Sequence, residues 1–353
     1  MGVKTKISWA DSSFNPWIGC TKVSAGCKNC YAETLDINRF SKTMDGATKE
    51  NPVGHWGKDA PRHLTHTWGD PVKWNALPFW ECARCGLRGA ASAPHGKCVA
   101  GCGGTIKPAR RRVFCASLAD WLDDEVPIKW LARLLKLIHD TPHLDWLLLT
   151  KRPENWRARV AASMRHLDRE QPEDARPYVT GNVCAMLDDW LNDKTPPQNV
   201  WLGTSVESQD WADDRIPLLL DIPAKVRFLS CEPLLGSVCF RPRCETVEDK
   251  IYALETGDAT RPVMLNGIHW VVCGGESGKH ARPMHPDWAR SLRDECNAAG
   301  AAFHFKQWGE WLPDNQNAEV NHPLSPPSSA IRVGKSKAGR LLDGREWNEF
   351  PAQ

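Results

Sequence analysis

Seven short apolar runs, spread over most of the 353-residue chain, constrain its fold more than any other feature. Each run is rich in leucine, β-branched or aromatic residues and ends in polar side chains that are capable of chemistry. Continuous apolar runs of this length are typical of strands that are buried on both faces. The runs are KISWADS, RVFCASLAD, HLDWLLLTKR, NVWLGTSVES, KVRFLSCEP, IHWVVCGGES and AFHFKQWGE.

Helical stretches separate several of these runs. In PIKWLARLLKLIHD, the residues Leu131, Leu134, Leu135 and Ile138 have the i, i+3, i+4, i+7 spacing of a buried helix face. HPDWARSLRDECNAAG predicts a second helix, with Gly300 at its carboxyl-terminal end. Strands that alternate with helices predict a parallel sheet with right-handed crossovers.

The polar residues gather at the carboxyl end of every predicted strand, which is where (β/α) barrels place their sites. An open doubly wound sheet is the alternative, but it would show this bias mainly at its switch point. We therefore predict an α/β fold with a partial or complete parallel (β/α) barrel of the TIM type.

Two segments interrupt the alternation and are predicted to be insertions on loops. Segment 75–108 contains a second group of cysteines, and segment 165–199 is polar and is expected to form a loop or helical insertion. The barrel would then comprise residues 1–74 and 109–311. Residues 312–353, rich in Pro, Asn and Ser, would form a carboxyl-terminal extension.

Composition excludes several classes of protein. With 41% hydrophobic and 25% charged residues, the chain can bury a core and is not expected to be disordered. A net charge of +2 shows no general attraction to polyanions, so any nucleic-acid contact must be local. No apolar run approaches the ~18 residues of a membrane helix, and the amino terminus lacks a signal-peptide core, so a cytoplasmic protein without membrane contact is expected. Fourteen cysteines there indicate metals or clusters in preference to disulfides.

Three cysteines lie within eleven residues near the amino terminus: Cys20, Cys27 and Cys30. Three thiolates on one short loop suit a cubane iron–sulfur cluster in which one iron is left open to a substrate or cofactor. Gly19 and Gly26, beside the first two cysteines, allow the loop to fold around a compact body. A zinc site completed by a histidine, and buried cysteines without a ligand, are the alternatives.

Four more cysteines, Cys82, Cys85, Cys98 and Cys102, form two closely spaced pairs twelve residues apart. Paired cysteines followed by glycine are typical of zinc knuckles, and two knuckles make a tetrahedral ribbon-type site. We therefore predict a zinc-binding module in this segment. An auxiliary iron–sulfur cluster is the alternative, and His95 could replace one cysteine.

The three-cysteine loop, followed by the aromatic Tyr31 and placed after the first predicted strand, resembles the loop of the radical S-adenosylmethionine (radical SAM) superfamily. Its first gap has six residues where that superfamily usually has three. The order of the motifs LLLTKRPE, GTSVES and SCEPLLG is similar to that of spore photoproduct lyase and its relatives. From SFNPWIGCTKVSAGCKNCYAE to the terminal GKSKAGRLLDG, the chain further resembles a phage-borne family of three-cysteine radical SAM proteins.

This resemblance implies an isomerase-type or lyase-type enzyme with a [4Fe–4S] cluster. The open iron would chelate S-adenosylmethionine, and one electron would cleave it into methionine and a 5′-deoxyadenosyl radical that abstracts hydrogen from carbon. The resemblance also implies an electron donor such as flavodoxin or ferredoxin. A phage-encoded chain would act in the cytoplasm of the host cell.

The resemblance gives the residues at the strand ends expected roles in binding the cofactor. Ser117 and Asp120 would hold its methionine end, Lys151 its carboxylate, and Ser205 and Glu207 its ribose hydroxyls or amino group. For each, a solvated strand end or a structural ion pair is the alternative. The expected cofactor-binding set is Tyr31, Ser117, Asp120, Lys151, Ser205 and Glu207.

Four residues are the expected catalytic set. Glu232 and Glu276 would meet the cofactor or the substrate, and Cys231 or Cys273 would return a hydrogen atom to the product, as in the lyase relatives. Each cysteine, like Cys115, also fits the description of a small buried apolar residue.

Two features favour a nucleic-acid substrate. Cations and indole rings are the groups that hold phosphates and stack on exposed bases. Together with the resemblance, they suggest DNA or a modified nucleotide as partner, with a hypermodified thymine or a base adduct taken out of the helix for reaction. The features are a basic flank after the knuckles (Lys107, Arg110, Arg111, Arg112) and tryptophans beside cations (Lys73–Trp74, Lys306–Gln307–Trp308).

Solvated loops and core tryptophans explain the same residues. A zinc-dependent nucleic-acid-binding protein without catalysis, and a radical SAM enzyme acting on a peptide or protein, are the alternative functions. The oligomeric state is left open by the sequence.

Overall fold

The chain, in a computed structural model, divides into two compact units. The first unit comprises residues 1–23, 32–202 and 223–225, and the second comprises residues 24–31, 203–222 and 226–353. The structure describes residues 5, 7–42, 48, 50, 52–90, 96–170, 182–240, 265–313 and 330–352.

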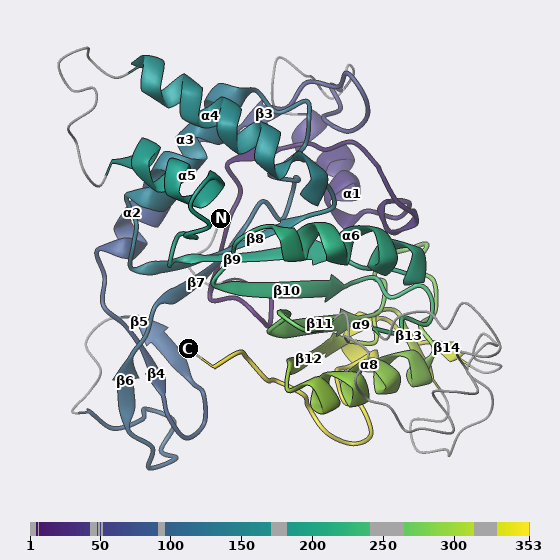
Figure 1. Cartoon of the computed structure of the whole chain (residues 1–353). Helices are drawn as coiled ribbons and strands as arrows, with labels where there is room; N and C mark the ends of the chain where they lie inside the picture. The colour runs from purple at the N-terminus through teal and green to yellow at the C-terminus, as the bar shows by residue number, and fades with distance from the viewer. Residues whose placement is uncertain are drawn as a thin grey trace, which may run out of the picture. The chain divides into compact units, whose positions relative to one another are not determined.

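A mixed α/β fold with a seven-stranded sheet confirms the predicted class (Figure 1). The strands follow one another in the order of the sequence, and neighbours are parallel, as expected for (β/α) units. β1 and β12 are the two ends of this order, which is consistent with a partial barrel. The strands are β1 (Ser12–Phe14), β7 (Arg111–Cys115), β8 (Leu144–Thr150), β9 (Val200–Ser205), β10 (Val226–Cys231), β11 (Trp270–Gly274) and β12 (Ala302–Gln307).

Five of the seven predicted runs contain a whole strand, and a sixth contains all of β7 but Arg111; the first prediction was wrong. β1 begins at Ser12, the last residue of KISWADS. The apolar character of that run comes from Trp9, which is 2% exposed and packs on Phe114 with 4.4 Å between ring centroids. A buried tryptophan just before a strand therefore makes the preceding residues look like part of the strand in the sequence.

Three helices of the first unit pack together: α3 (Ile128–His139), α4 (Trp156–Glu170) and α5 (Val183–Leu191) (Figure 1). The four predicted apolar positions of α3 are all at most 1% exposed, which confirms that helix and its buried face. Shorter helices of this unit are α2 (Gly69–Asn75) and most of α1 (Tyr31–Asn38).

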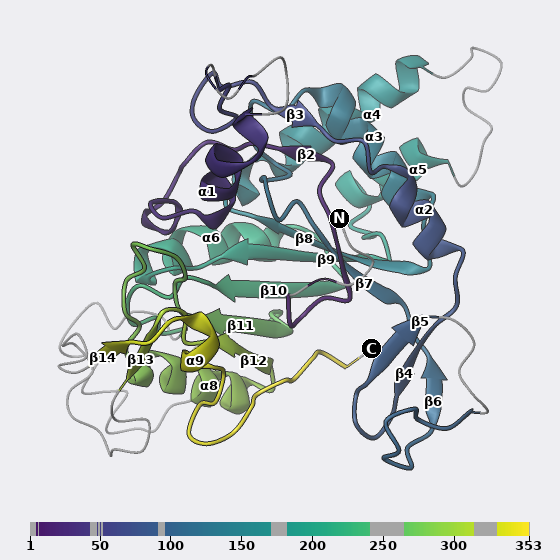
Figure 2. The same cartoon turned by 180° about the vertical axis from the view of Figure 1, so that it is seen from behind.

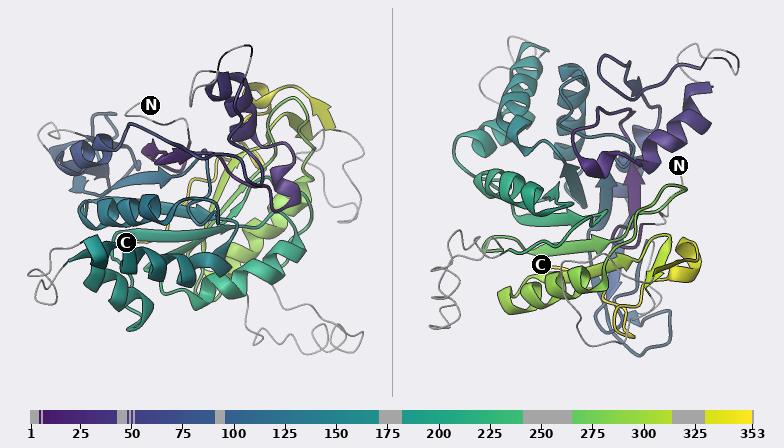
Figure 3. Two further views of the ribbon diagram at one scale, coloured as in Figure 1. Left: turned by 90° about the horizontal axis from the view of Figure 1, so that it is seen from above. Right: turned by 90° about the vertical axis from the view of Figure 1, so that its right-hand side faces the viewer.

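The second unit contains α6 (Gln209–Asp221) and α8 (Pro286–Ala299), and α8 packs against β11 and β12. Gly300 ends α8 in the left-handed conformation, with φ of 71°, as predicted. The carboxyl-terminal part of this unit includes β13 (Trp311–Pro313), which pairs antiparallel with β14 (Ala330–Arg332), and the short helix α9 (Lys335–Ala338). β14 and α9 are yellow in Figure 3.

Small antiparallel sheets lie outside the seven-stranded sheet. β4 (Phe79–Cys82), β5 (Arg88–Ala90) and β6 (Ile106–Pro108) form one of them within the second cysteine segment (Figure 2). β2 (Trp17–Ile18) and β3 (His63–Leu64) form another.

Parts of the predicted insertions lie outside the described residues. In segment 165–199 the structure describes the end of α4 and all of α5, but not residues 171–181, and in the extension it does not describe residues 314–329. His95 is likewise outside the described residues. No helix in the part of the chain that the structure describes is long and apolar enough to cross a bilayer.

Candidate functional site

Cys20, the first cysteine of the amino-terminal loop, lies two residues after the end of β2 in the first unit. The backbone N–H of Gly19 donates to the carbonyl of Leu118, and the backbone of Cys20 forms an isolated parallel β-bridge with that of Trp56. Gly19 has a φ of +113°, and a Cβ built on it would lie 2.3 Å from the carbonyl oxygen of His55. Only glycine fits this conformation and this space, so the chain reaches Cys20 through a turn that no other residue can make.

A buried arginine and aspartate at the carboxyl ends of β8 and β7 face Cys20. Arg152 Nη1 lies 3.7 Å from Cys20 Sγ and 3.0 Å from Asp120 Oδ2, and its Nη2 donates to the carbonyl of Thr21 at 2.7 Å. Burial, followed by the charge of Asp120, raises the pKa of Cys20 to about 12, although Arg152 acts against this rise. A metal or cluster bound by Cys20 would lower the pKa of this thiol, because metals stabilise the thiolate.

Asp120 was expected to hold the cofactor, and in the structure its oxygens are already used by the end of β8. They accept hydrogen bonds from Thr150 Oγ1 at 2.7 Å and from the backbone N–H of Lys151 at 2.8 Å, besides the one from Arg152. Asp120 therefore fixes the turn after β8. Arg152 was missed by sequence reasoning, although it adjoins Lys151 in the quoted motif, because a sequence does not show which of two neighbouring cations points inward.

A second buried ion pair holds Thr21, the residue that follows Cys20. Arg62 Nε donates to Asp123 Oδ2 at 2.8 Å, and its Nη2 donates to Thr21 Oγ1 at 2.7 Å. Glu125 accepts a hydrogen bond from Thr21 at 3.0 Å. Thr21, next to Cys20, is thus held by charged side chains from two distant segments, none of which the sequence analysis had identified.

Cys27 and Cys30 belong to the second unit, where strand-end carboxylates hold their loop. Ser24 Oγ donates to Glu207 Oε1 at 2.7 Å and lies 3.5 Å from Cys27 Sγ. Glu207, which follows β9, is fully buried and also accepts from Arg215 Nη1 at 2.9 Å. The carboxylate that was expected to contact the cofactor therefore contacts the cysteine loop.

Glu276, which follows β11, holds the same loop nearer to Cys30. It accepts hydrogen bonds from Asn29 Nδ2 at 3.1 Å and from Arg282 Nη2 at 2.6 Å. Arg282 also donates to the carbonyl of Ala25 at 3.0 Å. Burial acts to raise the pKa of Glu276, but the hydrogen bonds from Arg282 and Asn29 outweigh it and leave the pKa below its ordinary value of 4.5. The group is therefore a carboxylate at neutral pH.

Glu232, after β10, pairs with a cation that sequence reasoning had placed among nucleic-acid contacts. Its Oε2 lies 2.5 Å from Lys306 Nζ on β12. A Cβ built on Gly274, on the strand between them, would lie 3.4 Å from the Glu232 carboxylate and 3.5 Å from the Lys306 Cβ. Both side chains are partly exposed, at 12% for Glu232 and 24% for Lys306, so this pair faces solvent at the strand ends.

Cys231 and Cys273 are neighbours in the register of β10 and β11, and both are fully buried. Burial raises the pKa of each well above its ordinary value of 9.0, and Cys296 of α8 is among the charges that add to the rise. Both groups are therefore thiols, not thiolates, at neutral pH. A thiol carries the S–H hydrogen that the expected donor role requires.

The other expected residues occupy varied surroundings. Ser117 exchanges hydrogen bonds with Asn15 at 3.0–3.1 Å. Ser205 is 2% exposed, and its carbonyl accepts from Arg215. Tyr31 is 55% exposed at the start of α1.

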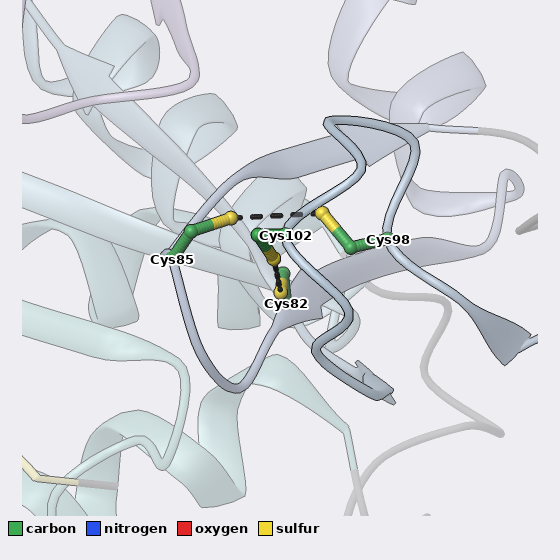
Figure 4. A group of neighbouring side chains, drawn as sticks. All are labelled: Cys82, Cys85, Cys98 and Cys102. Carbon is green, nitrogen blue, oxygen red and sulfur yellow. Dashed lines mark hydrogen bonds between the residues drawn. The ribbon is translucent and has the colours of Figure 1, made fainter.

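The four knuckle cysteines converge, and their ligand atoms all lie within 4.8 Å of one another (Figure 4). Cys82 Sγ lies 3.5 Å from Cys102 Sγ, and Cys85 Sγ lies 3.6 Å from Cys98 Sγ. The backbone N–H of Cys85 is the largest cause of a pKa for Cys82 of about 6, which makes it a thiolate at neutral pH. Four sulfurs at these separations could hold a metal ion.

Arg88 joins the sheet of this module to β1 and β7. Its Nε donates to both carboxylate oxygens of Asp11 at 3.1 Å, and its Nη1 donates to Glu81. Asp11 in turn accepts from the backbone N–H of Arg112 at 2.8 Å. The module is thereby fixed to the edge of the large sheet.

The expectation that the basic flank is an exposed patch was wrong for two of its four cations. Arg111 and Arg112, in β7, are 2% and 4% exposed. The guanidinium of Arg111 lies 4.9 Å from the ring centroid of Phe79, and that of Arg112 lies 5.5 Å from Trp201. Their aromatic partners come from other elements, which is why a run of cations in the sequence did not reveal their burial.

The tryptophans that were expected to stack on a base are also buried. Trp74 is 6% exposed and Trp308 is 1% exposed. Both are core residues, as the alternative interpretation held.

Fold and site together define a mixed α/β protein with a parallel sheet and a four-thiol site able to hold a metal ion. The chain belongs to the family described as "Protein of unknown function (DUF5131)", whose model matches residues 4–351. No curated protein and no solved structure matches the chain.

Proposed function

We propose that this protein is a radical SAM enzyme whose [4Fe–4S] cluster is held by Cys20, Cys27 and Cys30. The observation that carries the proposal is that charged residues after β7, β8, β9 and β11 hold both ends of the cysteine loop. Arg152 and Asp120 do so at Cys20, and Glu207 and Glu276 do so between Ser24 and Asn29. A loop that must present three thiolates in a fixed arrangement needs support of this kind.

The donor set fits such a cluster. The three thiols form no disulfide, lie within eleven residues of chain, and are thiolate ligands of the kind that iron–sulfur clusters require. When bound, the cluster would supply the electron that cleaves S-adenosylmethionine, and so the capacity to abstract hydrogen from carbon.

The protein's own residues would bind, orient and exclude water. Lys151, Ser117 and Ser205 are the strand-end groups proposed for S-adenosylmethionine, together with Tyr31. Asp120 and Glu207 would act as positioning residues, because their oxygens already hold Arg152 and Ser24. Glu276 would position Asn29 in the same way.

We propose a base of DNA as substrate, such as a hypermodified thymine or a base adduct that the enzyme rearranges or cleaves. The base would have to leave the helix or be presented on a single strand. Cys231 or Cys273 would return the hydrogen atom, and the pair Glu232–Lys306 would contact the substrate at the strand ends.

For the four-thiol site we propose zinc. Two short-spaced cysteine pairs and tetrahedral thiolate ligation are typical of structural zinc. The ion would have a structural role, because all four positions of the tetrahedron are filled by the protein.

Anaerobic reconstitution with iron and sulfide tests the proposal. We expect about four irons per chain, the visible absorbance of a cluster, and formation of 5′-deoxyadenosine from S-adenosylmethionine in the presence of a chemical reductant. Cys27→Ala should abolish all three. Cys239→Ser, at an exposed cysteine outside both groups, is the matched control and should change none of them.

Cleavage of S-adenosylmethionine that survives in Cys27→Ala would overturn the proposal. Zinc alone after anaerobic purification, with no iron taken up, would favour a non-catalytic zinc-dependent nucleic-acid-binding protein. Product formation on a peptide but on no nucleic acid would favour the third candidate, an enzyme that modifies a protein.

A further inference from the structure

Five exposed cations of the second unit lie on segments that are joined to one another by hydrogen bonds. They come from the cysteine loop, from the loop after β11, from the end of β14 and from α9. We name this set the carboxyl-terminal basic rim: Lys28, Lys279, Arg332, Lys335 and Lys337.

Hydrogen bonds hold β14 and α9 against the loop that follows β11. Arg332 Nη2 donates to the carbonyl of Gly278 at 2.9 Å, and the backbone N–H of Gly278 donates to Glu310 Oε1 at 3.1 Å. The backbone N–H of Gly334, which begins α9, donates to the carbonyl of Glu310 at 3.1 Å. Lys279, Arg332 and Lys335 are therefore neighbours through Glu310, although more than fifty residues separate the first from the other two.

The same loop contacts the cysteine loop. Asn29 Nδ2 donates to the carbonyl of His280 at 2.8 Å, and Arg282 Nη2 donates to the carbonyl of Ala25 at 3.0 Å. Lys28 lies between these two contacts in the sequence. The basic rim therefore borders the segment that carries Cys27 and Cys30, within one compact unit.

We infer that the carboxyl-terminal basic rim binds the phosphodiester backbone of the nucleic acid and so brings a base to the cysteine loop. This inference rests on the proposed function for its substrate class. Because the net charge of the chain is only +2, attraction of a polyanion requires a local excess of cations. One carboxylate, Glu310, lies among the five rim cations, 4.0 Å from Arg332, so four lysines of the rim remain in excess of it. Two of the four cations of the basic flank, by contrast, are buried in β7.

Aromatic side chains beside the rim favour nucleic acid over an acidic protein as partner. Tyr31, next to Cys30, is 55% exposed. The guanidinium of Arg332 lies 5.9 Å from the ring centroid of Trp311, which is itself partly exposed. Cations interleaved with accessible rings are the arrangement that holds a backbone while bases stack.

The test is the salt dependence of binding, measured by fluorescence anisotropy with the full chain and a labelled single-stranded oligonucleotide. The variant combines Lys279→Gln, Lys335→Gln and Lys337→Gln; Lys28 is left in place because it lies between two proposed cluster ligands. The charge-matched control combines Lys73→Gln, Lys107→Gln and Arg110→Gln, which removes three cations of the first unit that do not adjoin a proposed metal ligand.

We expect the rim variant to bind at least about tenfold more weakly at low salt. The slope of log affinity against log salt should become shallower by about 2, since each lost contact to a single strand contributes about 0.7. The control should keep the slope of the unmodified protein. An unchanged slope in the rim variant, or an equal loss in the control, would overturn the inference.

Binding requires neither cluster nor reductant, so this result is independent of the assay for 5′-deoxyadenosine. If the slope depends on the rim but the protein never cleaves S-adenosylmethionine, the inference about the rim stands and the proposed enzymatic function is wrong. If the protein cleaves S-adenosylmethionine but its binding does not depend on the rim, the proposed enzymatic function stands and the inference about the rim is wrong. If polyglutamate competes as well as the oligonucleotide does at equal charge, the rim is a site for acidic protein and the inference is wrong.

Discussion

At Gly26 the cysteine loop passes so close to Glu207 that no side chain fits between them. A Cβ built on Gly26 would lie 2.5 Å from Glu207 Oε1 and 2.7 Å from its Cγ. The carboxylate has little freedom to move away, because Arg215 and Ser24 bind it from two directions in a fully buried position. The glycine thus permits the contact that holds the loop of Cys27.

We predict that Gly26→Ala destabilises the protein by about 1–3 kcal/mol, as overpacking of a buried site generally does. It should also lower the iron retained after reconstitution, because the Ser24–Glu207 hydrogen bond cannot form beside the added methyl group. Thermal unfolding and iron content measure the two effects.

Gly236→Ala is the matched control for that prediction. It lies in the same unit, and a Cβ there would have no atom within 4 Å. Equal loss of stability or of iron in both variants would show that the contact with Glu207 is not the cause.

At the scale of single residues, the sequence predicts which side chains matter better than what they touch. Glu207 and Glu276 were identified because each follows a strand, and both do lie at the cysteine loop. Their partners, Ser24 and Asn29, are 183 and 247 residues away in the chain. A single sequence contains no information on pairs so far apart, so the contacts with the loop were not predicted. The expected contact of these carboxylates with the cofactor stays a prediction.

In the four-cysteine module, the residues that the structure describes form almost no core of their own. Trp80, Cys82 and Cys98 are buried in it, while Cys85 is exposed. Three strands of three or four residues give the four thiols little support, and the proposed ion would bridge them. The fold of β4, β5 and β6 should therefore depend on metal.

We predict that removal of metal, by a strong chelator or by Cys85→Ser, unfolds this module while the large sheet stays folded. Metal analysis should show the loss of one ion per chain. Hydrogen exchange should show faster exchange in β4 and β6, with protection retained in β8 and β10. Cys239→Ser should retain the ion, and unchanged exchange in β4 and β6 of the metal-free protein would contradict the prediction.

A helix or strand could be predicted from the sequence where the residues that it buries follow its own structural period. The helix α3 and its apolar face were predicted because one stripe of leucines packs on one side. The basic flank was misjudged because a charge pattern does not reveal that rings of Trp74 and Phe79 cover Arg111. Cations in a strand are read as exposed unless their aromatic partners are known, and those come from tertiary structure.

In the seven-stranded sheet, β12 is an end strand, and one of its edges has no neighbouring strand of that sheet to pair with. The chain end pairs with that strand: the backbone N–H of Phe305 donates to the carbonyl of Trp347, and that of Glu349 donates to Phe303. The indole N–H of Trp270 donates to the carbonyl of Glu349, and Phe350 packs on the Trp270 ring with 5.0 Å between centroids. The terminal residues therefore protect the edge from pairing with other chains.

We predict that a chain ending after Asp343 is less stable by at least about 3 kcal/mol, from lost hydrogen bonds and from lost burial around Trp347 and Phe350. It should also form soluble aggregates, because the uncovered edge of β12 offers unpaired N–H and C=O groups. Thermal unfolding and light scattering measure these effects. Truncation after Asp343 leaves Leu342 in the core and leaves Asp343 between Arg290 and Arg293.

A chain ending after Pro351 is the control, since it keeps every contact that covers β12. If the shorter chain stays monomeric and as stable as this control, the terminal segment is not the cover of the edge. If only the shorter chain aggregates, its association is caused by the uncovered edge of β12 and does not reflect the oligomeric state of the full chain. The free edge of β12, which a complete barrel would pair with β1, is in that case covered by the segment from Trp347 to Phe350.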